Sequence, residues 1–172
     1  MPRLPQLAED ADGLLAETRR QLGRVPNLYA ALANGPAALA GYLAMRDHLS
    51  KGALKPRLRE QLALLIAQEN TCTYCVSAHT LRGRRMGMTD EELTRTRQGT
   101  DDDPHAAAVL AITQKIMHAG GAITDDDLAT ARAAGVTDEE LTEIVAHIAL
   151  NTLSNYFNHL AQPELDFPEV QA

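Results

Sequence analysis

Residues 60–79 read EQLALLIAQENTCTYCVSAH and contain both cysteines of the protein, Cys72 and Cys75. Two residues separate the cysteines, His79 follows four residues after the second, and Glu60 precedes the first by twelve. We predict that these four residues form a redox site. The rest of the chain is expected to be its helical support.

The apolar residues before the cysteines predict a buried helix, because they recur at helical spacing and fill nearly all faces. Pro56 stands where a first-turn proline is tolerated, so the helix should begin near it. Asn70 and Thr71 interrupt the apolar run. Thr71 is a good N-cap, which predicts a second helix beginning at about Cys72.

The second helix would suit a reactive thiol in three ways. Cys72 would lie in its first turn, where the positive end of the helix dipole favours a thiolate. Cys75 and His79 would share a face, so the imidazole could accept the thiol proton. Cysteines at this spacing can also close a disulfide, so that one can resolve a sulfenic acid formed on the other.

A chain reversal near Asn70 would bring Glu60 to the same site. At roughly 1.5 Å per residue, Glu60 would lie about 16 Å and His79 about 12 Å below the turn. The predicted order down the hairpin is then Cys72, Cys75, His79, Glu60, in which the carboxylate orients the imidazole. A carboxylate in so apolar a helix needs a partner, and His79 is the nearest candidate.

Other interpretations of the same residues remain open. Cys72, Cys75 and His79 could ligate zinc in a small structural module, but structural zinc sites usually pair two short ligand motifs and no fourth ligand is evident. The cysteines could be buried structural residues, and Glu60 a solvated first-turn glutamate favoured by the dipole. A further alternative is a redox sensor or general thiol–disulfide oxidoreductase with little peroxidase turnover.

The motif resembles that of a known family. Glu60, Cys72-Thr-Tyr-Cys75 and Ala78-His79 resemble the signature of the AhpD-like alkylhydroperoxidases, within the carboxymuconolactone decarboxylase-like superfamily. The segment Leu-Gly-Arg-Val-Pro-Asn at 22–27 is similar to peroxidase-related members. The resemblance is close over residues 55–88 and looser over most of the chain.

This resemblance implies an all-helical fold, a homo-oligomer (a trimer or hexamer), and reduction of hydroperoxides by an external dithiol. By position, Cys75 would attack the peroxide, Cys72 would resolve, and His79 with Glu60 would relay protons. The implied reductant is dihydrolipoamide, or a lipoylated or peroxiredoxin protein. Tyr74 departs from the well-studied peroxidase members, which carry a histidine there. The decarboxylase branch lacks the cysteine pair, so its presence argues against that activity.

Composition favours a single all-α domain. Of the 172 residues 45% are apolar but only 3% aromatic, and alanine and leucine supply most of the apolar content. The net charge of −7 and the lack of a basic stripe argue against nucleic-acid binding. No apolar run suits a membrane span and no signal-peptide core is present, so we expect a cytoplasmic protein. The sequence shows no flavin, haem or nucleotide site.

The pattern predicts an extended arm at residues 1–5, a tail at 163–172 that could lie on a neighbouring subunit, and helices between them. Besides the central hairpin, the predicted helices are 6–22, 28–33, 36–50, 104–119, 124–135 and 138–160. Two similar segments, 84–94 and 132–142, each predict a glycine stop followed by a capping box. Gly83 within a helix indicates the close approach of a neighbouring helix.

Three asparagines, Asn151, Asn155 and Asn158, form a polar stripe on the last predicted helix. Such residues need partners. They could cap neighbouring helices, face a subunit interface, or line the pocket above the cysteines. We favour a structural role for them, and likewise for His147 and His159.

Overall fold

The computed structural model describes residues 1–9 and 13–172, and within them the protein is all α-helical. This confirms the predicted fold class. The helices are α1 Leu14–Leu22, α2 Asn27–Leu32, α3 Pro36–Leu49, α4 Pro56–Glu69, α5 Thr73–Arg85, α6 Asp90–Arg97, α7 Pro104–His118, α8 Asp125–Ala133 and α9 Asp138–Ala161. None of the helices in this described part of the chain has the length and apolar character needed to cross a membrane.

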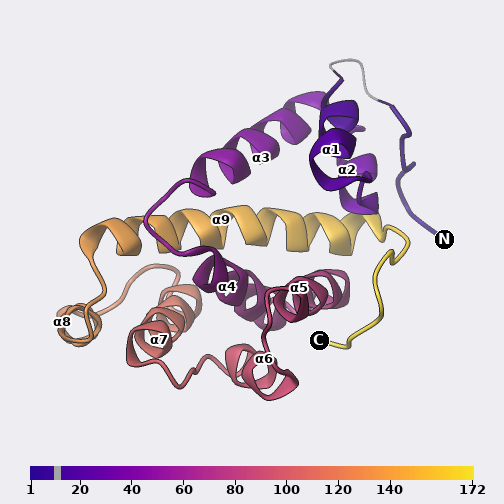
Figure 1. Cartoon of the computed structure of the whole chain (residues 1–172). Helices are drawn as coiled ribbons and strands as arrows, with labels where there is room; N and C mark the ends of the chain where they lie inside the picture. The colour runs from indigo at the N-terminus through magenta and orange to yellow at the C-terminus, as the bar shows by residue number, and fades with distance from the viewer. Residues whose placement is uncertain (10–12) are drawn as a thin grey trace.

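The long helix α9 runs through the middle of the molecule (Figure 1), with α1–α3 above it and α4–α7 below it in this view. The α4–α5 hairpin lies against α9, and α4 also packs on α6 and α7. The hairpin that carries the cysteines is therefore surrounded by other helices.

Two hydrophobic clusters meet at α4. Leu64 and Ala67 belong to a cluster with α2, α3 and α5, whereas Leu62, Leu65 and Ile66 belong to one with α7 and α9. This burial on opposite faces confirms the prediction from the apolar run. It fixes the rotation of α4 about its axis, and thereby the direction in which Glu60 points.

Local sequence signals set most helix ends. Pro56 and Pro104 occupy first turns, and Thr89 and Thr137 each form the predicted capping box, with a glutamate three residues on. Gly83 allows the close approach that its sequence indicated, since a Cβ there would lie 2.6 Å from a side-chain methyl carbon of α6.

The first helix is shorter than predicted. It begins at Leu14 rather than at residue 6, and ends at Gly23 as expected. Residues 6–9 are not helical, and residues 10–12 of the predicted helix lie outside the described residues. The backbone N–H of Leu7 donates to the carbonyl of Ala30, 2.9 Å away, so this segment lies against α2.

The C-terminal tail is extended as predicted, but in this structure it lies on its own chain. The Tyr74 hydroxyl donates to the Asp166 carboxylate at 2.6 Å, and the Val170 N–H donates to the Ser77 hydroxyl at 2.9 Å. Phe167 packs edge-on against the Tyr74 ring. The tail therefore covers one side of α5 beside the cysteines.

Candidate active site

The turn between α4 and α5 places Cys72 itself at the N-cap of α5, so the prediction of Thr71 as the cap was wrong by one residue. Thr71 adopts a left-handed conformation (φ 52°), which turns the chain instead of capping the helix. The Cys72 sulfur accepts the backbone N–H of Cys75 at 3.4 Å. The thiol thus takes the position that a serine or aspartate usually occupies.

The two thiols are free, buried and in contact. Their sulfur atoms lie 2.7 Å apart, and Cys72 and Cys75 are only 2% and 4% exposed. The side chain of Asn158, on α9, donates to the Cys75 sulfur at 3.1 Å. One thiol can therefore react with its neighbour without movement of the backbone.

The surroundings of the two thiols shift their pKa values in opposite directions. Hydrogen bonding from the Cys75 thiol, aided by the Cys75 N–H, lowers the pKa of Cys72 to about 7. Burial raises the pKa of Cys75, and contact with Cys72 raises it further. When the pair loses one proton, Cys72 is therefore the site of the resting thiolate.

Glu60 and His79 meet as the hairpin geometry predicted. The His79 Nδ1 lies 2.6 Å from a Glu60 carboxylate oxygen, and the two side chains are only 12% and 15% exposed. Burial opposes the charge of Glu60, but the imidazole nearby brings the net pKa of this carboxyl below its ordinary value. A carboxylate held to one ring nitrogen leaves the other nitrogen available for proton transfer.

A narrow cavity of about 30 Å³ connects the thiol with the imidazole. Cys75 and His79 both line it, together with Tyr29 and Tyr42. No direct hydrogen bond joins His79 to Cys75 among the described residues, and the cavity is large enough for about one water-sized group. The structure thus brings the four predicted site residues together as two contacting pairs that share a cavity.

Asn158 is the residue at the site that sequence reasoning assigned mainly to structure. Its amide donates to the Cys75 sulfur, while Asn155 accepts a hydrogen bond from Asn70 at 2.9 Å and also acts on the Cys75 thiol, where it opposes the rise in pKa that burial causes. His159 contacts the Asn70 carbonyl at 2.8 Å and so caps α4, in line with its expected structural role. The polar stripe was the available signal, but only the packing of α9 shows which asparagines reach the thiols.

Tyr74, where well-studied peroxidase members carry a histidine, has a structural partner. Its hydroxyl accepts the Leu28 N–H at 3.1 Å and donates to Asp166. Burial and the adjacent carboxylate raise the pKa of Tyr74, so the phenol stays protonated. Tyr74 therefore holds the tail on α5 and cannot replace a titrating histidine near neutral pH.

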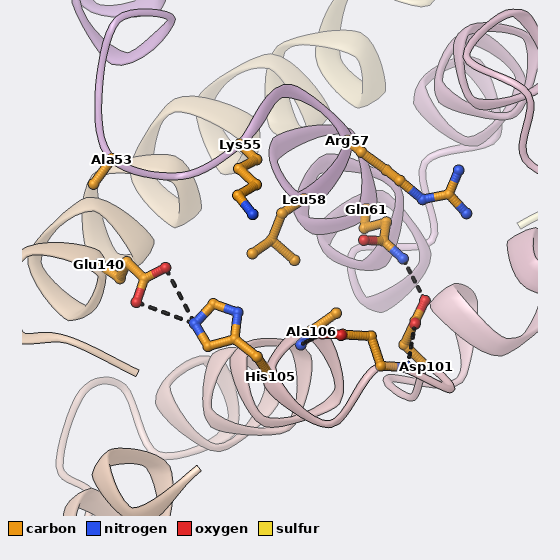
Figure 2. Close-up of a pocket in the computed structure, with 10 residues that line it drawn as sticks. Ala53, Lys55, Arg57, Leu58, Gln61, Asp101, His105, Ala106 and Glu140 are labelled. Atoms are coloured by element: carbon orange, nitrogen blue, oxygen red, sulfur yellow. Dashed lines mark hydrogen bonds and ion pairs between the residues drawn. The ribbon is translucent and has the colours of Figure 1, made fainter. Parts of the chain in front are cut away.

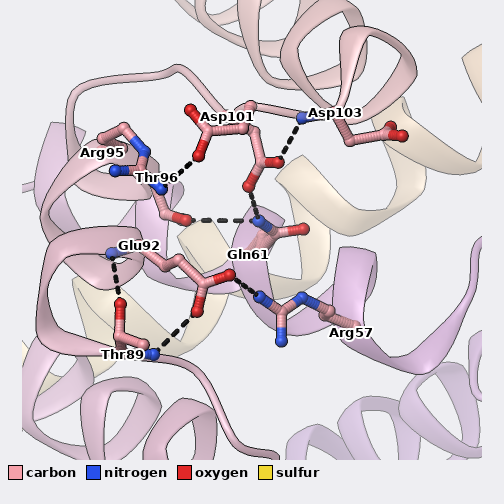
Figure 3. A network of polar contacts seen from close by, with 9 residues as sticks. Arg57, Gln61, Thr89, Glu92, Arg95, Thr96, Asp101 and Asp103 are labelled. Carbon is pink, nitrogen blue, oxygen red and sulfur yellow. Dashed lines mark hydrogen bonds and ion pairs between the residues drawn. The ribbon is translucent and has the colours of Figure 1, made fainter.

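A separate cavity of about 250 Å³ lies on the other side of α4. Lys55, Leu58, His105 and Glu140 are among its lining residues (Figure 2), and it contains neither cysteine. Beside it, the Gln61 amide donates to Asp101 and Thr96, and Arg57 pairs with Glu92 (Figure 3). These contacts tie α4 to α6 and to the loop before α7. They hold the rear face of the helix that presents Glu60.

The zinc alternative can be compared with the arrangement of possible ligands in the described residues. Within residues 1–9 and 13–172, no three histidine, cysteine or acidic side chains converge in a way that could hold an ion. The zinc alternative requires Cys72, Cys75 and His79 to converge, whereas His79 pairs with Glu60.

Comparison with known proteins agrees with this geometry. The profile of the Carboxymuconolactone decarboxylase family matches residues 36–115, which include α4, α5 and the four site residues. A structure described as the alkylhydroperoxidase AhpD core, an uncharacterized peroxidase-related protein from Ralstonia eutropha, superposes with a TM-score of 0.85. It is 26% identical, and the match covers 96% of this chain and 92% of that one. The profile match and the structural similarity support assigning this chain to the AhpD-like carboxymuconolactone decarboxylase superfamily.

Members of the AhpD-like fold differ in described activity. A peroxidase-related protein from Silicibacter has a TM-score of 0.81 at 21% identity, over 94% of this chain and 89% of that one. A debrominase in complex with 2,3,4-tribromopyrrole has a TM-score of 0.75 at 16% identity, over 96% and 93% of the two chains. These two similarities concern the fold alone.

A curated relative resembles this AhpD-like chain in sequence. It is an alkyl hydroperoxide reductase from Mycobacterium tuberculosis, 36% identical over 76 residues. The match covers 44% of this chain and 22% of the relative, so the chain corresponds to about a fifth of that protein's length.

Proposed function

We propose that the protein is a thiol-dependent hydroperoxide reductase. The observation that carries this proposal is the pair of free thiols 2.7 Å apart, joined by a cavity to a His79–Glu60 pair. A buried dithiol next to an oriented imidazole supplies both a nucleophile and a proton carrier. The similarity to a peroxidase-related protein and to an alkyl hydroperoxide reductase supports the same chemistry.

The first half of the proposed cycle is attack by Cys75. The thiol gives its proton to the free nitrogen of His79 through the cavity, and Glu60 stabilises the imidazolium. The thiolate attacks the terminal oxygen of the hydroperoxide and breaks the O–O bond. The leaving alkoxide takes the proton back from His79, which yields an alcohol and a Cys75 sulfenic acid.

The second half is resolution by Cys72. Its sulfur attacks the sulfenic sulfur of Cys75, one water leaves, and a disulfide forms. The pKa of about 7 makes Cys72 a good resolving thiol, since about half of it is ionised at neutral pH. An external dithiol, for which we propose dihydrolipoamide or a lipoylated or peroxiredoxin protein of the cytoplasm, then reduces the disulfide.

The test is a thiol count with intact mass on reduced protein, before and after one equivalent of an organic hydroperoxide. Loss of both thiols with a mass decrease of about two daltons is expected, because one disulfide forms. Cys75→Ser should retain no peroxidase activity. Two persistent thiols in the wild type, or full activity in Cys75→Ser, would contradict the proposal.

We also propose that the protein forms a homo-oligomer through α9, with a trimer or hexamer expected from the family. The helix exposes Val145, Leu153, Tyr156 and Leu160, each at least 43% accessible, on a single chain. A run of large apolar side chains on one helix is typical of an association surface. Light scattering should give a multiple of the 18.6 kDa chain mass, and Tyr156→Glu should lower it. A monomer at micromolar concentration would contradict this.

A further inference from the structure

A larger cavity of about 280 Å³ lies beyond the His79–Glu60 pair. Residues of α2, α3, α4, α5 and α9 line it, it is open to solvent on one side, and both site residues form part of its wall. It shares Tyr29, Tyr42, His79 and Arg82 with the narrow cavity that reaches Cys75. A molecule held here would therefore lie at the entrance to the thiol.

The charge of this cavity is opposite to that of the protein. Three arginines line it, Arg46, Arg59 and Arg82, whereas Glu60 is the single carboxylate among its lining residues. The chain as a whole has a net charge of −7. A concave site of one sign concentrates ligands of the opposite sign, so this cavity favours an anion.

Two of the three guanidinium groups have donors to spare. Arg46 is engaged by Asp47 and also contacts Tyr29. Arg59 has one hydrogen bond, to the Leu54 carbonyl. The guanidinium of the half-buried Arg82 has no hydrogen bond or ion pair within the described part of the chain, although such a group carries five N–H donors.

Arg82 remains charged in this setting. Burial opposes the charge, but Glu60 nearby keeps the pKa of the guanidinium above its ordinary value. The Nε2 atom of His147, on the wall formed by α9, is also buried without a partner. Buried polar groups without partners are uncommon in folded proteins, and a ligand that supplies oxygen atoms would satisfy the N–H donors of Arg82.

The positions of Arg59 and Arg82 relative to the thiol set the size of the ligand. Cys75, His79 and Arg82 follow one another on one face of α5, at intervals of four and three residues. Seven residues correspond to about 10 Å along a helix. Arg82 also lines the narrow cavity beside Cys75, whereas Arg59 lines only the larger one, so a ligand that reaches both Arg59 and Cys75 must have its two ends separated by several carbon atoms.

We propose that this cavity binds the carboxylate of an organic hydroperoxide and directs the hydroperoxyl group to Cys75. The inference rests on the proposed peroxidase function and names its substrate class. The carboxylate takes hydrogen bonds from Arg82 and Arg59, and the aliphatic chain passes the two tyrosines. The reaction converts the hydroperoxy acid and two thiols into the hydroxy acid, one disulfide and one water.

The binding test uses ω-hydroxyoctanoic acid and its methyl ester, which are not oxidants, with reduced protein in a calorimeter. The free acid should bind at least about tenfold more tightly than the ester, because only the acid offers a charged acceptor. Arg59→Gln and Arg82→Gln should each weaken binding of the acid by about tenfold and leave the ester unchanged. Arg84→Gln is the matched control, since this arginine is exposed on the same helix and pairs with Asp90.

The turnover test compares ω-hydroperoxyoctanoic acid with its methyl ester. The wild type should show a kcat/KM at least about tenfold higher for the acid, and Arg59→Gln should remove the preference while retaining activity on the ester. If Arg82→Gln fails to fold, Arg59→Gln and the comparison of acid with ester still test whether the cavity binds the carboxylate. Equal binding and turnover of acid and ester would overturn the carboxylate site but leave the peroxidase proposal standing. Arginine-dependent binding with no thiol oxidation by either hydroperoxide would overturn the peroxidase function instead.

Discussion

The acidity of Cys72 provides a prediction that can be worked from the contacts around its sulfur. Its pKa lies at about 7 instead of near 9.0, and the largest cause is hydrogen bonding from the Cys75 thiol. A fall of two pH units corresponds to about 2.7 kcal/mol in favour of the thiolate. Cys75→Ala removes the thiol donor but keeps the backbone N–H. We therefore expect the pKa of Cys72 to rise by about one pH unit or more in this variant.

The measurement is ultraviolet absorbance of the thiolate as a function of pH in the single-cysteine protein. At pH 7 the thiolate fraction of Cys72 should fall from about one half to about a tenth or less. Cys75→Ser is the matched control, because its hydroxyl can still donate and should give an intermediate pKa. If Cys75→Ala titrates at the wild-type value, the neighbouring thiol is not the main cause, and the helix N-terminus would account for the acidity.

Substitutions at Glu60, Asn158 and Gly83 provide three further predictions. Glu60→Gln should reduce kcat/KM for hydroperoxides by about 10- to 100-fold, since the amide cannot stabilise a charged His79. The pKa of Glu60 is depressed in the folded protein, so the wild type loses the stabilising contribution of this carboxylate below pH 4.5, and the free energy of unfolding of Glu60→Gln should fall less over the same pH range. Asn158→Ala should slow sulfenic acid formation in single turnovers by about tenfold, because the Cys75 thiolate loses a hydrogen-bond donor, and an unchanged rate would argue against this role. Gly83→Ala should lower the free energy of unfolding by about 1 kcal/mol in urea denaturation, because the cost of overpacking against Leu93 exceeds the gain in helix propensity. A stabilised variant would contradict the close approach of α6 to Gly83.

The sequence correctly predicted those helix ends that depend on local signals alone. Pro56 and Pro104 mark helix starts, and the capping boxes at Thr89 and Thr137 form as read, because each depends on residues within one turn. The start of the first helix was misplaced at residue 6. Its apolar periodicity continues into residues that instead contact α2 through the backbone of Leu7, and periodicity cannot show such a partner.

Part of the candidate site was also predictable from local geometry, and part of it was not. The Glu60–His79 contact followed from the geometry of a helical hairpin, because both positions are fixed by their distance from one turn. The N-cap of α5 could not be predicted in this way. Thr71 is the better capping residue by type, but its left-handed backbone leaves Cys72 at the N-cap. The contact of Asn158 with Cys75 depends on how α9 crosses the hairpin, which no local pattern encodes.

The N-cap position of Cys72 couples the redox state of the protein to the start of α5. In the reduced protein the amide of Cys75 donates to a sulfur that is about half ionised at neutral pH. Oxidation turns that sulfur into a neutral disulfide atom, a much weaker acceptor. The first turn of the helix should therefore loosen when the two cysteines are oxidised and tighten when they are reduced. The nuclear magnetic resonance signal of this one amide proton would then report the redox state of the protein without any added label.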